Sequence, residues 1–148
     1  MFENKIKIDD IEETIKDEKQ NLSFLYENKF DKTYPKLVKK LKNKKVVLYG
    51  GGVFLETINK YFDLSKLNII GIADKKYCCE ECKDETFLGY KTLSPDEIKD
   101  LNPDFVLIST KFYISIFEDL YYNLFKNTNI KVKPLVKKSF WTLLKEIL

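Results

Sequence analysis

The stretch VVLYGGGVFLETINKYFDLSKLNIIGIAD, residues 46–74, decides the fold. It opens with a short apolar run, rich in residues that favour strands, which ends in three glycines. Residues 53–62 then repeat apolar side chains at the spacing of a helix that covers a sheet. A nearly continuous apolar run at 67–73 follows, as is typical of a strand buried on both faces. Strand, glycine turn, helix and strand in this order predict two parallel strands joined by a helical crossover.

The same alternation continues along the chain. Further strands are predicted at 89–93, 105–110 and 130–136, and further helices at about 95–101, at 113–124 and from Ser139 onward. The segment Ser94-Pro95-Asp96-Glu97 is a capping box with proline at the first helical position. Because parallel strands need crossovers, and these are right-handed, we predict an α/β fold. Its core is a Rossmann-like parallel sheet of about five strands, in the order 3-2-1-4-5, flanked by helices.

Residues 1–44 show a different pattern, which is highly charged and helical. We predict that they form an N-terminal helical extension packed on one compact unit, residues 45–148. A break is expected around residues 28–33, after which Pro35 opens a second short helix. The apolar residues on one side of the first helix are Ile8, Ile11, Ile15, Leu22 and Leu25.

The charged residues exclude several classes of function. Lys and Arg number 26 against 23 Asp and Glu, a net charge of +3 that is too weak to indicate a nucleic-acid partner. Every basic residue is lysine, since the chain has neither arginine nor histidine. Without arginine there is no bidentate group for a 2′-phosphate, so NADP is disfavoured. Without histidine the most common acid or base at neutral pH is missing, which argues against an enzyme.

The hydropathy pattern predicts a cytoplasmic protein. The N-terminus, MFENKIKIDD, lacks the apolar core of a signal peptide, and no apolar run reaches the roughly 18 residues of a membrane span. The second helix carries a lysine cluster that we interpret as a solvated face, at positions 36, 39, 40, 42, 44 and 45.

The candidate binding residues follow the predicted strands at their carboxyl ends, where open α/β sheets bind ligands. Gly50 permits a tight turn, and Gly52 lets the backbone approach a pyrophosphate at the N-terminus of the next helix. Asp74 follows at the tip of the second strand, where it can accept hydrogen bonds from ribose hydroxyls. Leu55 occupies the position of the third glycine in the full dinucleotide fingerprint. A leucine there would keep the helix farther from the strand than the geometry of an NAD site requires. The predicted cofactor-binding residues are Gly50, Gly51, Gly52, Val53, Asp74, Ser109, Thr110 and Lys111.

Four segments carry a family resemblance: VVLYGGG, NIIGIAD, FLGYKTLSPDEI and NPDFVLIST. Over about residues 44–126 the chain resembles the small Rossmann-like domains of bacterial sugar-processing proteins, such as the N-terminal domains of nucleotide-sugar acetyltransferases and dehydratases. The resemblance implies that Gly50, Gly51, Gly52 and Asp74 bind a nucleotide, most often a nucleotide sugar. It also implies an accessory role in glycan or surface polysaccharide biosynthesis, beside a separate catalytic partner. NAD is the alternative cofactor.

Two other classes of function stay open. The first is a small NAD-using oxidoreductase or sugar-modifying enzyme that would use Lys111 or Tyr122. Tyr122-x-x-x-Lys126 with the earlier Ser109 has the spacing of short-chain dehydrogenases, although we interpret this helical tyrosine as a packing residue. The second is an interaction protein that retains the fold without a ligand.

The cysteines and the C-terminal segment each suggest a further site. The candidate metal ligands are Cys78, Cys79 and Cys82, of which Cys79 and Cys82 have the C-x-x-C spacing of a metal site. Zinc requires four ligands, however, and the sequence offers no second pair of cysteines and no histidine. We therefore predict a reduced loop without metal. The apolar segment SFWTLLKEIL, residues 139–148, either closes the core or forms a homodimer through the C-terminal helix.

Overall fold

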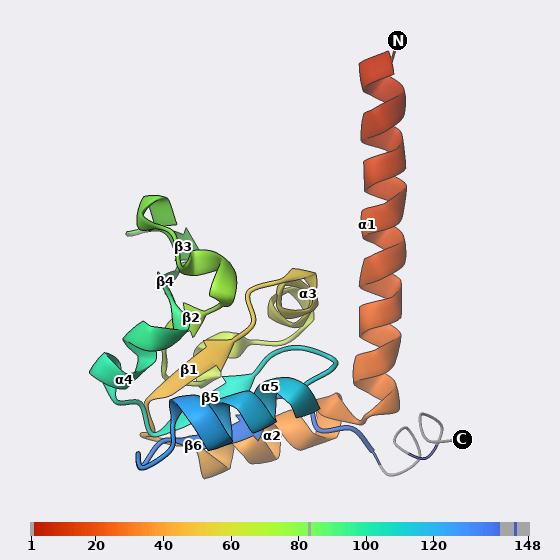
Figure 1. Cartoon of the computed structure of the whole chain (residues 1–148). Helices are drawn as coiled ribbons and strands as arrows, with labels where there is room; N and C mark the ends of the chain where they lie inside the picture. Colours follow the sequence, from red (N-terminus) through yellow and green to blue (C-terminus); the bar gives the residue numbers. More distant parts are fainter. Residues whose placement is uncertain (1, 83, 140–143, 145–148) are drawn as a thin grey trace.

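The structure, a computed structural model, describes residues 2–82, 84–139 and 144, with the backbone alone for residues 2–9 and Cys82. It is a mixed α/β fold in which a mostly parallel sheet is covered by helices (Figure 1). The helices are α1 (Phe2–Glu27), α2 (Phe30–Lys40), α3 (Val53–Tyr61), α4 (Ile98–Leu101) and α5 (Ile114–Asp119), the last continuing as a π-helical turn, η5 (Leu120–Leu124). The strands are β1 (Val46–Tyr49), β2 (Ile69–Ala73), β3 (Thr86–Phe87), β4 (Tyr90–Leu93), β5 (Phe105–Ile108) and β6 (Lys131–Pro134). Short 3-10 turns are η1 (Leu64–Lys66), η2 (Lys75–Tyr77), η3 (Glu80–Cys82) and η4 (Pro95–Glu97).

The sheet has six strands in the order β3-β4-β2-β1-β5-β6, so the predicted strand count and order are wrong. The difference is the two-residue strand β3, which pairs antiparallel with β4 at one edge. Leu88 and Gly89 connect these two strands, and both have positive φ, as a two-residue hairpin requires. Only Gly89 is a sequence signal for such a turn, because leucine rarely adopts this conformation. The remaining strand pairs are parallel.

Each face of the sheet has its own apolar core. Val46 and Leu48 of β1 pack with residues of α1, α2 and α3, whereas Val47 and Tyr49 pack with residues of α4, α5 and η5. All four side chains are buried, as a strand covered on both faces requires. The helices therefore form a layer on each side of the sheet.

The first two helices differ from the prediction at their junction. The break is confined to Asn28 and Lys29, and α2 begins at Phe30, so the prediction that Pro35 opens the helix is wrong. Phe30 and Tyr34 stack with ring centroids 5.1 Å apart, and both are buried in the core. Burial of this aromatic pair on one helix face explains why the helix extends ahead of the proline.

The ends of the chain bear on two further predictions. Within the described residues, no helix combines the length and apolar character needed to cross a bilayer. The predicted helix from Ser139, and the homodimer through it, involve residues 140–143 and 145–148, which lie outside the described part of the chain.

Candidate functional site

Three loops meet at the carboxyl ends of β1, β2 and β5. The strands end level with one another, because Tyr49 pairs with both Ala73 and Ile108. Seven of the eight predicted binding residues line one pocket of about 360 Å³ between these loops and the N-terminus of α3. We call it the α3 pocket, and its lining residues are Asp17, Gln20, Asn21, Gly50, Gly52, Val53, Phe54, Asp74, Ser109, Thr110, Lys111 and Phe112.

A second pocket of about 460 Å³ adjoins the first, and we call it the β1–β5 pocket. The two pockets share Gly50, Asp74 and Thr110, so that Asp74 lies where they meet. The β1–β5 pocket is lined by Tyr49, Gly50, Asp74, Lys75, Thr110, Ser115, Ile116 and Asp119.

Gly50 is required by the close approach of two loops. Its φ is +119°, a conformation that side chains with a Cβ rarely adopt. A Cβ at this position would lie 2.7 Å from Cγ2 of Thr110 and 3.3 Å from the carbonyl oxygen of Ser109. The amide of Gly50 donates to the carbonyl of Ala73 over 2.8 Å. Gly50 therefore joins the loops after β1, β2 and β5 and contributes no free amide to the pocket.

The amide of Gly51 is also engaged within the protein. It donates to Oδ2 of Asp74 over 2.9 Å, while Oδ1 of Asp74 accepts from the amide of Lys76 over 3.2 Å. The Lys76 ammonium in turn donates to the carbonyl of Gly51. A Cβ on Gly51 would lie 2.6 Å from the hydroxyl of Tyr77, so this ring covers Gly51 and leaves no room for a side chain. Asp74 thus holds the glycine loop while facing both pockets.

Gly52 and the first turn of α3 form the open part of the glycine loop. Gly52 is exposed, and a Cβ there would meet nothing within 4 Å. It is the N-cap of α3, and no side chain caps this helix end. Within the described residues, no hydrogen bond reaches the amides of Gly52, Val53 or Phe54. Free amides at a helix N-terminus, together with the partial positive charge of the helix, favour an anion.

Lys111 brings a positive charge to the same pocket. Its ammonium lies 5.5 Å from the ring centroid of Phe24 and 5.8 Å from that of Phe54, and it forms no salt bridge within the described part of the chain. Partial burial lowers the pKa of Lys111, whereas the charge of Asp17 acts in the opposite direction. An anion in the α3 pocket would find a lysine that has no competing carboxylate bonded to it.

The two residues before Lys111 have structural contacts. Ser109 is buried, and its hydroxyl lies 2.7 Å from the carbonyl oxygen of Gly50 and 3.1 Å from that of Tyr49. The hydroxyl of Thr110 lies 3.3 Å from the carbonyl oxygen of Phe112. Ser109 thus holds β1 and β5 together at the floor of the site, and Thr110 shapes the wall that both pockets share.

The β1–β5 pocket differs from the α3 pocket by the hydroxyl of Tyr49, since each pocket is lined by two carboxylates and one lysine. Burial, assisted by the charges of Asp74 and Asp119, raises the pKa of Tyr49 to about 12. Tyr49 is therefore a neutral hydrogen-bonding group at physiological pH. Two carboxylates against the single charge of Lys75, beside a neutral hydroxyl, suit a ligand rich in hydroxyl groups better than a second anion.

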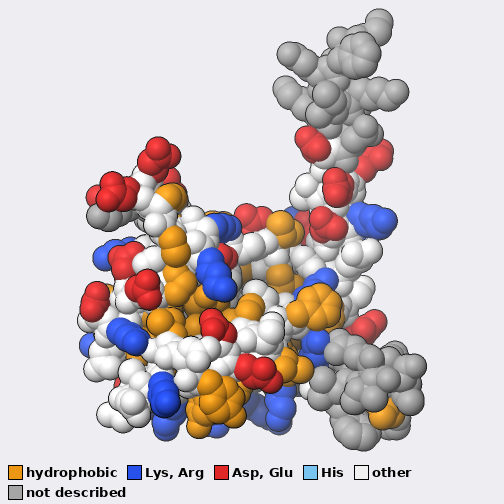
Figure 2. Space-filling view, viewed as in Figure 1, with side chains coloured by type: hydrophobic (Ala, Val, Ile, Leu, Met, Phe, Trp, Pro, Cys, Tyr) orange, Lys and Arg blue, Asp and Glu red, His pale blue; other side chains and the backbone are white. Residues whose placement is uncertain are grey.

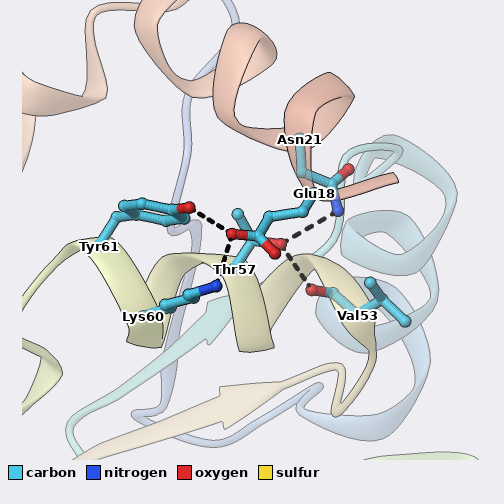
Figure 3. A network of polar contacts seen from close by, with 6 residues as sticks. All are labelled: Glu18, Asn21, Val53, Thr57, Lys60 and Tyr61. Atoms are coloured by element: carbon cyan, nitrogen blue, oxygen red, sulfur yellow. Dashed lines mark hydrogen bonds and ion pairs between the residues drawn. The ribbon is translucent and has the colours of Figure 1, made fainter. Parts of the chain in front are cut away.

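Helix α1 forms one wall of the α3 pocket, which sequence reasoning missed. Figure 3 shows how α1 is attached to α3: Asn21 donates to the hydroxyl of Thr57 over 3.3 Å, and that hydroxyl donates to the carbonyl of Val53 over 3.1 Å. Glu18 accepts from Lys60 over 2.8 Å and also from the hydroxyl of Tyr61. These partners are about 40 residues apart, so no local pattern in the sequence could have indicated them.

The Glu18 contacts should make the attachment of α1 dependent on pH. Hydrogen bonds from Lys60 and then Tyr61 hold the pKa of Glu18 below its usual value of 4.5. A lowered folded-state pKa stabilises the folded state above the usual pKa, and this contribution is lost as pH falls through the folded value. We expect Glu18→Gln to lower the melting temperature slightly at about pH 7 and not at about pH 3. The effect is small because solvent screens the pair, in which the side chain of Lys60 is 61% exposed and that of Glu18 is 23% exposed.

Melting curves at a series of pH values for the wild type, Glu18→Gln and the exposed control Glu12→Gln check this result. A difference between wild type and Glu18→Gln that is the same at both pH values would contradict the role of the carboxylate.

The other candidate residues lie elsewhere. Tyr122 is 63% exposed, and neither it nor Lys126 lines the two pockets. Among the described residues no group of three or more His, Cys, Asp or Glu has the arrangement of a metal site. Cys78 is a free and exposed thiol, whereas Cys79 is disulfide-bonded, so the prediction of a fully reduced loop is wrong. The side chain of Cys82 lies outside the described atoms.

Fold and site together define a mixed α/β protein with a pair of joined pockets at the carboxyl edge of its parallel strands. Residues 42–137 match the family described as C2185-like, N-terminal, and the chain belongs to this family. No curated protein and no solved structure shows a significant match to the chain. The matched residues include all six strands and every predicted binding residue.

Proposed function

We propose that this protein binds a nucleotide or a nucleotide sugar across the two joined pockets. The observation that carries the proposal is the uncapped N-terminus of α3, whose free amides face a lysine that has no salt-bridge partner among the described residues. In this arrangement the phosphates lie in the α3 pocket between the first turn of α3 and Lys111.

Asp74 favours a nucleotide over a simple inorganic anion. Its carboxylate lies at the junction of the two pockets, where it would repel a second negative charge. The same carboxylate retains lone pairs beside its bonds to the amides of Gly51 and Lys76, and these can accept from sugar hydroxyls. A ligand with a phosphate at one end and a hydroxyl-rich sugar next to it satisfies both requirements.

The composition of the chain and its family resemblance indicate which class of nucleotide the site would bind and in what role. Phosphate would be held by backbone amides and lysine alone, which disfavours the 2′-phosphate of NADP. Leu55 occupies the position of the third fingerprint glycine, which makes a nucleotide sugar a better candidate than NAD. Resemblance to Rossmann-like domains of sugar-processing proteins suggests an accessory role in glycan biosynthesis beside a separate catalytic partner.

A thermal-shift panel of UDP-, GDP- and CMP-sugars, NAD and S-adenosylmethionine tests the proposal. A ligand present at ~100 times its Kd should stabilise the protein by about 2.7 kcal/mol, which raises the melting temperature by several degrees. We expect a nucleotide or nucleotide sugar to give the largest shift.

The matched variants are Lys111→Met and Lys126→Met. Methionine is an unbranched side chain without the ammonium that lies over the rings of Phe24 and Phe54, so the charge is removed and affinity should fall at least about tenfold. Lys126 is exposed and lines neither pocket, so its replacement should leave the shift unchanged. A panel without any response, or a response that Lys111→Met leaves intact, would refute the proposed site.

A further inference from the structure

A groove of about 570 Å³ lies beside the edge strand β6, between α2 and α5, and shares no lining residue with the α3 pocket or the β1–β5 pocket. We call it the β6 groove. Its floor and walls are largely apolar, with contributions from Leu37, Phe117 and Leu135. Four lysines border this apolar surface, two from α2, one from β6 and one from the segment that follows β6: Lys36, Lys40, Lys133 and Lys137.

The charges of the β6 groove are not balanced within the protein. No aspartate or glutamate lines the groove, and none of the four lysines forms a salt bridge within the described part of the chain. The ammonium groups of Lys40 and Lys133 lie so close together that the contact lowers the pKa of Lys133. Clustered lysines around an apolar surface fit a partner that is both apolar and acidic.

The chain itself carries a segment of this kind on the part of α1 that stands clear of the sheet (Figure 1). We call residues 10–16 the α1 arm. Ile11 and Ile15 lie one helical turn apart and are 58% and 48% exposed. Further along the same stripe, Leu22 and Leu25 pack on the core of the protein. The apolar stripe of α1 is thus covered at its C-terminal end and uncovered on the arm.

Carboxylates surround the two exposed isoleucines. Three acidic residues and one lysine make the arm negative, and Figure 2 shows acidic side chains gathered around this part of α1. Asp10 and Glu12 border the stripe on opposite sides at the helical angle of about 100° per residue. The arm therefore has the apolar centre and acidic rim that match the apolar centre and basic rim of the β6 groove.

We propose that the α1 arm of one copy docks in the β6 groove of a second copy, so that the protein associates with itself. Pairing of two α1 arms would also bury the isoleucines, but it would bring two acidic segments together without a compensating charge. Docking in the groove buries the same side chains and neutralises both surfaces.

Sedimentation equilibrium of the wild type and of two variants tests this association. The wild type should exceed the 17.5 kDa of one chain as concentration rises, whereas a monomer up to ~1 mM would overturn the proposal. We expect Ile11→Asp with Ile15→Asp, and separately Lys36→Glu with Lys40→Glu, to weaken association at least about tenfold each. All four positions are exposed, and unchanged melting temperatures confirm that the variants fold. The control, Lys99→Glu with Lys126→Glu, makes the same charge change away from the groove.

Mixing the two variants distinguishes arm-in-groove docking from arm pairing. The arm variant keeps an intact groove, and the groove variant keeps an intact arm, so an equimolar mixture should associate more strongly than either variant alone. If α1 arms pair with each other, the groove variant should associate like the wild type and mixing should restore nothing, which would overturn the proposal.

Salt gives a second and independent readout. Raising the ionic strength from about 0.05 M to about 0.5 M should weaken contacts between opposite charges. The same change would strengthen association between two acidic arms. Stronger association at high salt would therefore also overturn docking in the groove.

Discussion

Replacement of Leu55 by alanine is expected to lower the free energy of unfolding by about 3 kcal/mol. Leu55 is fully buried in the core between α3 and the sheet. Removal of its side chain loses buried apolar surface and leaves a cavity that the rigid strand beneath cannot fill. The substitution would weaken the packing of the first turn of α3 against β1, and this same turn carries the proposed phosphate site.

Urea unfolding monitored by circular dichroism measures this change, and Val53→Ala is the matched control. Val53 lies on the same helix but is 49% exposed, so its truncation should cost less than about 1 kcal/mol. Equal effects of the two substitutions would mean that α3 does not pack on the sheet through Leu55.

Replacement of Gly50 by alanine is expected to lower the free energy of unfolding by at least about 2 kcal/mol. The positive φ is strained for any residue with a Cβ, and the added atom would collide with Thr110 and with the backbone at Ser109. The collision also separates loops that form the boundary between the two pockets, so ligand binding should weaken in parallel.

Gly52→Ala is the control for the glycine loop, because Gly52 has φ −117° and open space around its Cα. We expect the stability of this variant to stay within about 0.5 kcal/mol of the wild type. The same urea titrations compare both variants. A Gly52→Ala variant that unfolds as easily as Gly50→Ala would contradict the arrangement of the loop.

Local patterns in the sequence predicted the elements that local forces determine. The strands at β1, β2 and β5 are continuous apolar runs, and their positions are confirmed within a few residues. The capping box is also confirmed, because Glu97 accepts from the amide of Ser94 and the reciprocal bond is present. These features depend on neighbouring residues alone, which is why they could be predicted.

The features that sequence reasoning missed depend on tertiary contacts. Gly51 and Asp74 were both expected to contact a ligand, yet they bond to each other, which confines the open amides to Gly52 and the start of α3. The wall supplied by α1 depends on contacts such as that of Asn21 with Thr57. Residues that share a pocket but lie far apart in the chain leave no periodic signal.

The central claim is that the first amides of α3 bind the phosphate of a nucleotide. Amide chemical shifts of the ¹⁵N-labelled protein, recorded during titration with UDP-glucose and with pyrophosphate alone, test it most directly. We expect the largest changes at the amides of Gly52, Val53 and Phe54, and smaller changes or none for the same ligands with Lys111→Met. Spectra in which these three amides stay unchanged at millimolar UDP-glucose, GDP-mannose and NAD would contradict the claim.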